Sequence, residues 1–309
     1  MTVTSPGRLS YEETAKIADR IRLRVLDHTL KNNGGYMSQA CSSADTLAAL
    51  YTQIMNLNES EGPSVPKPFV GVPGPNNKGY LSGGLYNGKE APDKDIFIFS
   101  PAHYGLVLYA TLVEIGRMSP DGLAQFYKDG SVVEMISAEH SPGVETTTGS
   151  LGQAISQAGG IALARKKLGE TGRVWVMMSD GEFQEGEVWE AILLLRHYKL
   201  DNLGVYVDVN GQQCDGFMKD LVNFNDLKRM LESFGAKVAE VDGHDIEALT
   251  VPSLEKPDGR PLFVLALTDP VHKLEIFNER APKLHYLRFK DEQEKSRYQA
   301  AYDKMKEEL

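Results

Sequence analysis

The feature that most constrains the fold is a series of short, mostly apolar runs that alternate with a helical pattern. Residues 174–178 form a continuously apolar run, residues 204–209 form a valine-rich one, and a helical pattern covers 185–198 between them. Two further runs, at 237–241 and 262–267, have the same character. Strands buried on both faces have this composition, and their alternation with helices is typical of a parallel sheet. We therefore expect an α/β fold, with helices on both faces of a parallel sheet and ligands bound beyond the carboxyl ends of its strands.

The N-terminal region contains a clear helix-start signal. Ser10 and Glu13 form a capping-box pattern ahead of apolar residues at helical spacing. We expect this helix to end near the Asn-Asn-Gly-Gly segment at 32–35 and a second helix to open around Ser43.

The remaining segments complete one domain. Residues 59–95 are rich in glycine, proline, asparagine and lysine, which predicts a long loop region of the kind that is usually functional or mobile. Residues 291–309 are highly charged and predict a solvated helix. We expect residues 1–309 to form a single domain with helical N- and C-terminal extensions.

Net charge and cysteine content limit the partners and the compartment. The formal net charge of −10 on 309 residues argues against a nucleic-acid or an anionic-membrane partner. The only cysteines are Cys41 and Cys214, which is typical of reduced thiols in a cytoplasmic protein. Residues 1–13 lack the apolar segment of a signal peptide, and no apolar run is long enough to span a membrane. We therefore expect a cytoplasmic protein.

Polar residues directly follow two of the predicted strands. Asp180 comes after the first apolar run and Asn210 after the second, an interval about the length of a strand–helix–strand unit, so both are expected at one edge of the sheet. A carboxylate, an amide oxygen and a nearby backbone carbonyl suit Mg²⁺ or Ca²⁺, with water and substrate phosphates in the remaining positions. Gly181 allows a diphosphate to approach the backbone at a helix start. Asp-Gly and Asn-Gly pairs are also common turn formers. Their joint placement after two buried strands favours the metal site over two unrelated turns.

The segment from 179 to 212 resembles the cofactor motif of thiamine diphosphate enzymes, in which a Gly-Asp-Gly is followed, one strand–helix–strand unit later, by an asparagine. The flanking residues, GEFQEGEVWEA and VNGQQCDG, are similar to those of transketolases in particular. Further segments that resemble transketolases lie at 100–105, 143–153 and 242–245, and the similarity runs from about residue 10 to residue 290. The resemblance implies a thiamine diphosphate-binding fold. It also implies thiamine diphosphate and Mg²⁺ as cofactors, with Ca²⁺ or Mn²⁺ as substitutes.

The resemblance further implies roles for individual residues. The metal ligands are Asp180, Asn210 and the backbone carbonyl of Gln212. Apart from Asp180 and Asn210, the residues that line the cofactor are His103, Gly149, Ser150, Leu151 and Gly181. Catalytic roles fall to His103 at the diphosphate, to Glu185 at a subunit interface that couples two cofactors, and to His285, which faces the substrate.

Transketolases have three substrate-facing histidines, and this sequence keeps only part of that set. Tyr36 occupies the position of the first histidine, and Met135 aligns with the second, with His140 nearby but out of register. His285 matches the third. Ser179 replaces the first glycine of the cofactor motif, a change that a small residue allows. Because the cofactor residues are kept while two substrate residues differ, we predict the same chemistry on a different substrate.

In transketolases, a second domain binds the pyrimidine ring and carries the glutamate that activates the cofactor. This sequence has no counterpart of that glutamate, so the resemblance implies a partner subunit with the pyrimidine-binding domain, most simply in an α₂β₂ heterotetramer. The chain alone is then expected to be inactive. The reaction implied is transfer of a two-carbon ketol unit from a ketose, phosphorylated or otherwise modified, to an aldehyde.

Two alternatives remain open. One is the α subunit of a 2-oxo acid dehydrogenase or of an acyloin-forming decarboxylase, and the other is a non-catalytic regulatory subunit. The Glu-Thr-Thr-Thr-Gly loop at 145–149 favours the transketolase over the first alternative. Intact Asp180, Asn210 and His103 argue against the second, because a site without a function is not expected to keep them.

Overall fold

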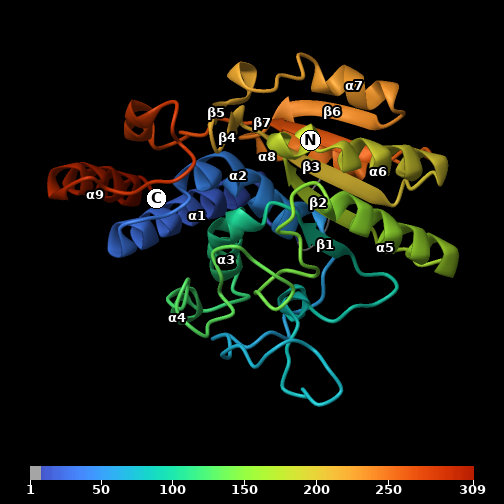
Figure 1. Ribbon diagram of the computed structural model, residues 1–309, viewed down its shortest axis with the longest axis horizontal. Coiled ribbons are helices and arrows are strands. Elements are labelled where there is room, and N and C mark those ends of the chain that lie inside the picture. The colour runs from blue at the N-terminus through green and yellow to red at the C-terminus, as the bar shows by residue number, and fades with distance from the viewer. Residues whose placement is uncertain (1–7) are drawn as a thin grey trace.

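The computed structural model describes residues 8–309, and a five-stranded parallel sheet lies at its centre (Figure 1). The strands are β1 (Ile96–Phe99), β2 (Val174–Ser179), β3 (Leu203–Val209), β6 (Lys237–Asp242) and β7 (Leu262–Leu267). They lie in the order β1-β2-β3-β7-β6, and every neighbouring pair is parallel. The four predicted strands are confirmed to within one residue at each end. Residues 1–7 lie outside the described residues. They are part of the segment 1–13 for which we predicted no signal peptide.

Helices cover both faces of this sheet, which confirms the predicted fold class. The helices are α1 (Tyr11–Asn32), α2 (Met37–Ala49), α3 (Gly105–Glu114), α4 (Pro120–Leu123), α5 (Ala154–Leu168), α6 (Gly186–His197), α7 (Leu227–Ser233), α8 (Ile246–Leu254) and α9 (Glu292–Glu307). On one face, Trp175 and Tyr206 pack in a core with α1, α2, α3 and α8. On the other face, Val176 and Val205 pack with α5, α6 and α7. Burial on both faces explains why the strands are apolar throughout.

The first helix begins and ends where the sequence predicts, whereas the second does not. The hydroxyl of Ser10 accepts from the N–H of Glu13 at 3.2 Å, and the Glu13 carboxylate accepts from the N–H of Ser10 at 2.7 Å. Helix α2 begins at Met37 rather than around Ser43, so that prediction was wrong. All 13 residues of α2 are buried, and no side chain caps its start. The search for an apolar stripe locates a helix that buries one face. It does not locate the start of a helix such as α2 that is enclosed on every side, because polar residues are then buried as well.

Helix α5 is not among the helices that we predicted from the sequence. Glycine inside a helix is unfavourable in isolation, and α5 contains Gly159 and Gly160. A Cβ atom on Gly159 would lie 2.8 Å from Cδ2 of Leu195 in α6. The close packing of two helices therefore requires a residue that local propensity disfavours.

The predicted loop region at 59–95 is irregular apart from a short 3₁₀ turn at Gly83–Asn87. Hydrogen bonds hold it against the loop that leads to the candidate site. The N–H of Gly83 donates to the carbonyl of Glu139 at 2.7 Å, and the N–H of Gly143 donates to the carbonyl of Gly83 at 2.9 Å. The side chain of Asn87 also donates to the carbonyl of Gly143 at 3.1 Å. The region is thus fastened to the rest of the fold at its C-terminal end.

The charged C-terminal segment forms helix α9, as predicted, and packs beside α1 (Figure 1). Asp291 caps it by accepting from the N–H of Glu294 at 2.8 Å. Most of its residues are exposed, but Tyr298 is buried against Phe277 and Phe289. No helix among residues 8–309 combines the length and the apolarity that a membrane crossing requires.

Candidate active site

Asp180 and Asn210 lie at the carboxyl ends of two neighbouring strands, where the sequence places them. Asp180 opens a 3₁₀ turn, Asp180–Gln184, directly after β2, and Asn210 directly follows β3. Gly211 joins the two, because its N–H donates to Oδ2 of Asp180 at 2.9 Å. The φ of Gly211 is 66°, a left-handed conformation that favours glycine. Adjoining parallel strands and one tight turn therefore bring the two side chains together.

The carboxylate of Asp180 is buried and only half satisfied. Its Oδ2 accepts the bond from Gly211, whereas Oδ1 is buried and has no hydrogen-bond partner in the protein. Burial, and then the nearby charge of Asp208, raises the pKa of Asp180 to about 8. An ionised carboxylate in such surroundings is unfavourable unless it is paired. Asp180 therefore requires either a proton or a cation.

The amide of Asn210 has a fixed orientation. Its Nδ2 donates to the hydroxyl of Tyr104 at 3.1 Å and to Oδ2 of Asp208 at 2.8 Å. Its Oδ1 accepts from the N–H of Gln212 at 2.8 Å, which leaves one lone pair of that oxygen for a ligand. The three predicted metal ligands are thus linked by hydrogen bonds through Gly211 and Asn210.

Asp208 is a buried polar residue of the site that we did not predict from the sequence. It lies in β3, is fully buried, and is surrounded by hydrogen-bond donors. These donors are Ser42 at 2.7 Å, Tyr104 at 3.0 Å, Asn210 at 2.8 Å and Thr268 at 2.5 Å. The sequence did contain a signal for this residue, namely a carboxylate inside an otherwise apolar strand. A carboxylate is stable in such a place only where hydrogen-bond donors surround it.

Glu182 is a second buried acid of the site, whereas Glu185 and Glu187, which follow it in the chain, are exposed. The carboxylate of Glu182 accepts from the N–H of Gly152 at 3.0 Å, from the N–H of Ser179 at 2.9 Å and from the hydroxyl of Ser100. Burial raises the pKa of Glu182. This one side chain therefore ties together three segments that the sequence assigns to the cofactor site.

His103 lies in a cluster of aromatic rings with Tyr36 and His285. The ring centroid of His103 is 5.8 Å from that of Tyr36 and 5.1 Å from that of His285. Tyr36 and His285 are themselves 5.4 Å apart. Burial, with the neighbouring His285, lowers the pKa of His103 to about 3, so this imidazole is neutral at physiological pH.

A main-chain bridge brings His285 to this cluster from the far end of the chain. The N–H of Gly35 donates to the carbonyl of Leu287 at 3.0 Å, and the N–H of Leu287 donates back at 2.9 Å. Nδ1 of His285 lies 3.3 Å from the side-chain nitrogen of Gln39 in α2. The structure thus places Tyr36 and His285, both singled out from the sequence, on one side of His103.

The remaining predicted cofactor residues line the same edge of the sheet. Gly149, Ser150 and Leu151 are exposed, and Thr148 holds their loop to β1 through a 2.6 Å bond to the carbonyl of Phe99. A Cβ on Gly181 would meet nothing nearer than Cβ of Gln213 at 3.9 Å, so its backbone is open to a ligand.

Glu185 lies apart from the buried acids. It is exposed at the start of α6 and packs against Gly152, whose φ of 86° favours glycine. Its position on the surface is compatible with the predicted interface role, which stays a prediction.

The structure does not bring His140 to the His103 cluster. Its ring lies 4.5 Å from that of Phe69, and its Nε2 lies 3.2 Å from Oε1 of Glu134. Met135 is half-buried in the loop between these residues. His140 thus lies between Phe69 of the 59–95 region and Glu134, and its ring is not part of the His103 cluster.

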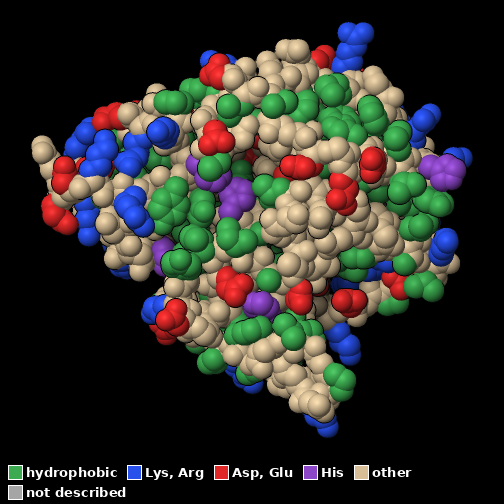
Figure 2. Space-filling view, in the orientation of Figure 1, with side chains coloured by type: hydrophobic (Ala, Val, Ile, Leu, Met, Phe, Trp, Pro, Cys, Tyr) green, Lys and Arg blue, Asp and Glu red, His purple; other side chains and the backbone are tan. Residues whose placement is uncertain are grey.

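A cavity of about 480 Å³ adjoins Asp180 and Asn210. Lys219 and Lys228 line it, as do further acidic residues, so it carries no excess of positive charge. Figure 2 shows histidine and acidic side chains near the centre of one face, with lysine and arginine mainly toward its margins. An anionic ligand at Asp180 therefore requires an accompanying cation.

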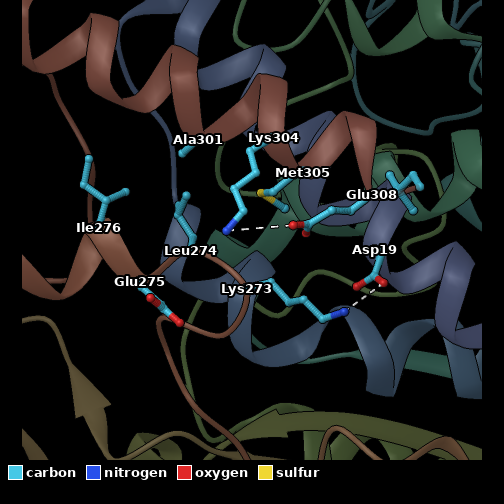
Figure 3. A pocket seen from close by; sticks show the side chains of 10 residues that line it. Asp19, Lys273, Leu274, Glu275, Ile276, Ala301, Lys304, Met305 and Glu308 are labelled. Atoms are coloured by element: carbon cyan, nitrogen blue, oxygen red, sulfur yellow. Dashed lines mark hydrogen bonds and ion pairs between the residues drawn. The ribbon is translucent and has the colours of Figure 1, made fainter.

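A second hollow, of about 370 Å³, lies between α1, α9 and the turn at 273–276 (Figure 3). Its lysines are already paired, Lys273 with Asp19 at 3.1 Å and Lys304 with Glu308 at 3.8 Å. None of the predicted site residues lines it.

Comparison with known proteins assigns the chain to a family. Residues 86–266 match the family described as transketolase, thiamine diphosphate binding domain. One of the subunits of the apulose-4-phosphate transketolase of Actinobacillus succinogenes is 33% identical over 288 residues, which cover 91% of this chain and 93% of that protein. The chain belongs to the transketolase family. The predicted thiamine diphosphate-binding fold is therefore confirmed, whereas the roles of individual site residues stay predictions.

Other transketolases match to differing extents. The 6-deoxy-6-sulfo-D-fructose transketolase subunit SqwG of a Clostridium species is 28% identical over 254 residues, which cover 81% of this chain and 82% of that protein. A crystal structure of a transketolase mutant from Pichia stipitis, in complex with fructose 6-phosphate, shares the fold with a TM-score of 0.70 at 21% identity. That match covers 97% of this chain and 45% of the transketolase, so the chain spans less than half of that protein's length.

Proposed function

We propose that this chain binds the diphosphate of thiamine diphosphate through Mg²⁺ and acts, with a partner subunit, as a transketolase-like transferase. The observation that carries the proposal is the buried, unpaired Oδ1 of Asp180 beside Asn210, at the carboxyl edge of a transketolase-family sheet. A buried carboxylate with a free oxygen favours a hard cation, since a cation supplies the charge that the protein does not.

The donor set fits Mg²⁺. Asp180 offers Oδ1, Asn210 offers Oδ1, and Gln212 offers its backbone carbonyl. These oxygens are too few to complete an octahedron, so water and phosphate oxygens take the other positions, which is how Mg²⁺ is usually held. Ca²⁺ and Mn²⁺ are possible substitutes because they also accept oxygen ligands.

When bound, the cofactor supplies the nucleophilic carbon and the electron sink that carry a two-carbon unit. The chain's own residues then bind and orient. Gly181 leaves room for a diphosphate at the start of the 3₁₀ turn. His103 is neutral, so its ring can donate at one nitrogen and accept at the other. The ring of His285 lies beside it, and in this proposal His285 bonds a hydroxyl of the substrate.

A partner that carries the pyrimidine-binding domain completes the site in this proposal, most simply in an α₂β₂ heterotetramer. The apulose-4-phosphate and 6-deoxy-6-sulfo-D-fructose relatives are both named as transketolase subunits. Around the candidate site, Leu151 is 39% exposed and Ile136 is 46% exposed. Exposed apolar residues around a site are typical of a surface that a partner covers. The isolated chain is expected to have no turnover. Full activity of the chain alone would contradict the proposal that a partner subunit is required.

We propose a ketose donor, phosphorylated or otherwise modified, and an aldehyde acceptor. The names of the two relatives include a sugar phosphate and a sulfonated deoxy sugar, which supports a specialised donor. Tyr36, which stands beside His103 where transketolases have an imidazole, changes the shape of the pocket and so also supports a specialised donor. Membership of the transketolase family favours a transketolase subunit over the α subunit of a 2-oxo acid dehydrogenase. The hydrogen bond that joins the segments of Asp180 and Asn210 favours a metal-binding, catalytic subunit over a regulatory one.

The test is binding of thiamine diphosphate and Mg²⁺ to variants of Asp180. Asp180→Ala removes the only charged ligand and is expected to weaken Mg²⁺-dependent binding by several kcal/mol, measured by calorimetry on the chain assembled with its partner. The fold is expected to persist, because the carboxylate costs free energy in the absence of a cation. Asp220→Ala, a change at an exposed aspartate in the 3₁₀ turn Met218–Asp220, serves as the matched control. Unchanged affinity in Asp180→Ala would contradict the proposal.

A further inference from the structure

Gln212 is a buried residue whose side-chain amide has no partner. The residue is 8% exposed, and neither Oε1 nor Nε2 forms a hydrogen bond within the protein. Burying an amide without replacing its bonds to water costs free energy, so such groups are rare unless they have a function. Any role of the Gln212 backbone carbonyl leaves this side chain unexplained.

The position of Gln212 connects it directly to the proposed metal ligands. Its N–H donates to Oδ1 of Asn210 at 2.8 Å, and Asn210 is joined through Gly211 to Asp180. Oδ1 of Asp180 is likewise buried and without a partner. Unsatisfied polar atoms therefore occur on both segments that contribute to this one site.

The next residue shows that a glutamine here can be satisfied. Nε2 of Gln213 donates to Oε1 of Gln184 at 3.3 Å, and Gln213 is less buried than Gln212. The two glutamines lie in the same short strand, β4 (Gln212–Gln213), which pairs with β5 (Gly216–Phe217). The lack of partners is thus particular to Gln212 and is not a general property of the loop.

We infer that the side-chain amide of Gln212 is a further binding group of the diphosphate–metal site. Its Nε2–H would donate to an oxygen of the diphosphate, and its Oε1 would accept from a water molecule of the site. An amide suits both contacts because it carries donors and an acceptor on one planar group. This inference rests on the proposed function and adds to it a residue that acts through its side chain.

The inference predicts effects of opposite sign on the free and the loaded protein. Replacing Gln212 by leucine or methionine removes two unsatisfied polar atoms at similar volume, so the protein without ligand becomes more stable. The same change removes two bonds to the ligand, so binding becomes weaker. A glutamine with a purely structural role would not give this pair of effects, because its replacement would lower the stability of the free protein.

The experiment compares wild type, Gln212→Leu and Gln212→Met with the control Gln213→Leu. Each protein is assembled with its partner, its melting temperature is measured without ligand, and thiamine diphosphate with Mg²⁺ is titrated by calorimetry. We expect both Gln212 variants to melt about 2 °C higher than wild type without ligand. We expect them to bind the cofactor at least about tenfold more weakly. Gln213→Leu is expected to melt lower than wild type, because it loses its bond to Gln184, and to bind normally.

Each outcome separates the inference from the proposed function. A wild type that binds no thiamine diphosphate overturns both. A wild type that binds, together with Gln212 variants of unchanged affinity, overturns the inference alone. Gln212 variants that are less stable without ligand also overturn it, because the amide then contributes to the free protein.

Discussion

The hydroxyl of Tyr104 donates a 3.0 Å hydrogen bond to Oδ2 of Asp208, and this bond joins the His103 turn to the end of β3. The same hydroxyl accepts from Nδ2 of Asn210 at 3.1 Å. Tyr104 is fully enclosed, and burial next to Asp208 holds the pKa of its hydroxyl well above the usual range. The orientation of a predicted metal ligand thus depends on a residue adjacent to His103, the predicted diphosphate-binding histidine.

This relationship predicts that Tyr104→Phe weakens Mg²⁺ binding without removing any ligand. Asn210 loses one of the two partners of its Nδ2, so its amide is held less firmly. We expect a loss of about 1–2 kcal/mol in the free energy of unfolding, and a several-fold weaker Mg²⁺-dependent affinity for the cofactor. Urea denaturation and calorimetry measure the two effects. Tyr109→Phe removes a buried hydroxyl that donates to the carbonyl of Glu134, and it is expected to lower stability alone. Equal effects of both variants on affinity would contradict the prediction.

A buried ion pair between α1 and α2 predicts a large loss of stability when it is broken. Arg22 is fully buried and donates to Asp45, and Nδ1 of His244 lies 2.8 Å from Oδ2 of the same carboxylate. Asp45→Ala leaves the guanidinium with fewer acceptors, and we expect it to lower the free energy of unfolding by about 3 kcal/mol. Urea denaturation measures the difference. Glu12→Ala breaks an exposed pair with Lys16 and is expected to leave stability unchanged, so a similar loss in both variants would refute the prediction.

Glu145 predicts a pH dependence of stability. Its carboxylate accepts from Nδ2 of Asn87 at 2.9 Å, and burial raises the pKa of Glu145 to about 7, from an ordinary value of 4.5. Because the folded protein binds this proton more tightly than the unfolded chain, the stabilising contribution is complete below pH 4.5 and is lost as pH rises through 7.

Glu145→Gln retains an acceptor for Asn87 and removes the titration. We expect the variant to be more stable than wild type at pH 8, by on the order of 2–3 kcal/mol, with the difference vanishing near pH 4. Urea denaturation of both proteins at pH 4, 6 and 8 measures it. A difference that does not change with pH would show that Glu145 does not titrate in this range.

Tyr36 predicts the substrate preference of the assembled enzyme. Its ring lies edge-on to those of His103 and His285, where an imidazole is replaced by a larger group with one hydroxyl. A site without the bonding group for a hydroxyl does not select for that hydroxyl. We expect kcat/KM for a deoxygenated or modified ketose to exceed that for xylulose 5-phosphate by at least tenfold, about 1.4 kcal/mol.

The matched variants sharpen this comparison. Tyr36→His is expected to raise kcat/KM for xylulose 5-phosphate relative to the modified ketose. Tyr286→His, a change to a neighbouring ring 5.0 Å from Tyr36, is expected to leave the ratio unchanged. If wild type prefers xylulose 5-phosphate by tenfold, the replacement of the imidazole does not determine specificity.

The sequence by itself determined the features that depend on local pattern. The strands, the α1 capping box, and the position of Asp180 and Asn210 at strand ends follow from runs of adjacent residues. Strand burial on both faces gives an apolar run, and parallel strands place their carboxyl ends together, so the edge that holds the candidate site was predictable.

Only the tertiary structure decided which residues surround that edge. The approach of His285 to Tyr36 depends on the bridge between Gly35 and Leu287, and the burial of Asp208 depends on donors from α2, the His103 turn and the end of β7. The early start of α2 likewise depends on its enclosure by other elements. Such contacts join residues far apart in the chain, and their free energy depends on burial and hydrogen bonding, which no local pattern records.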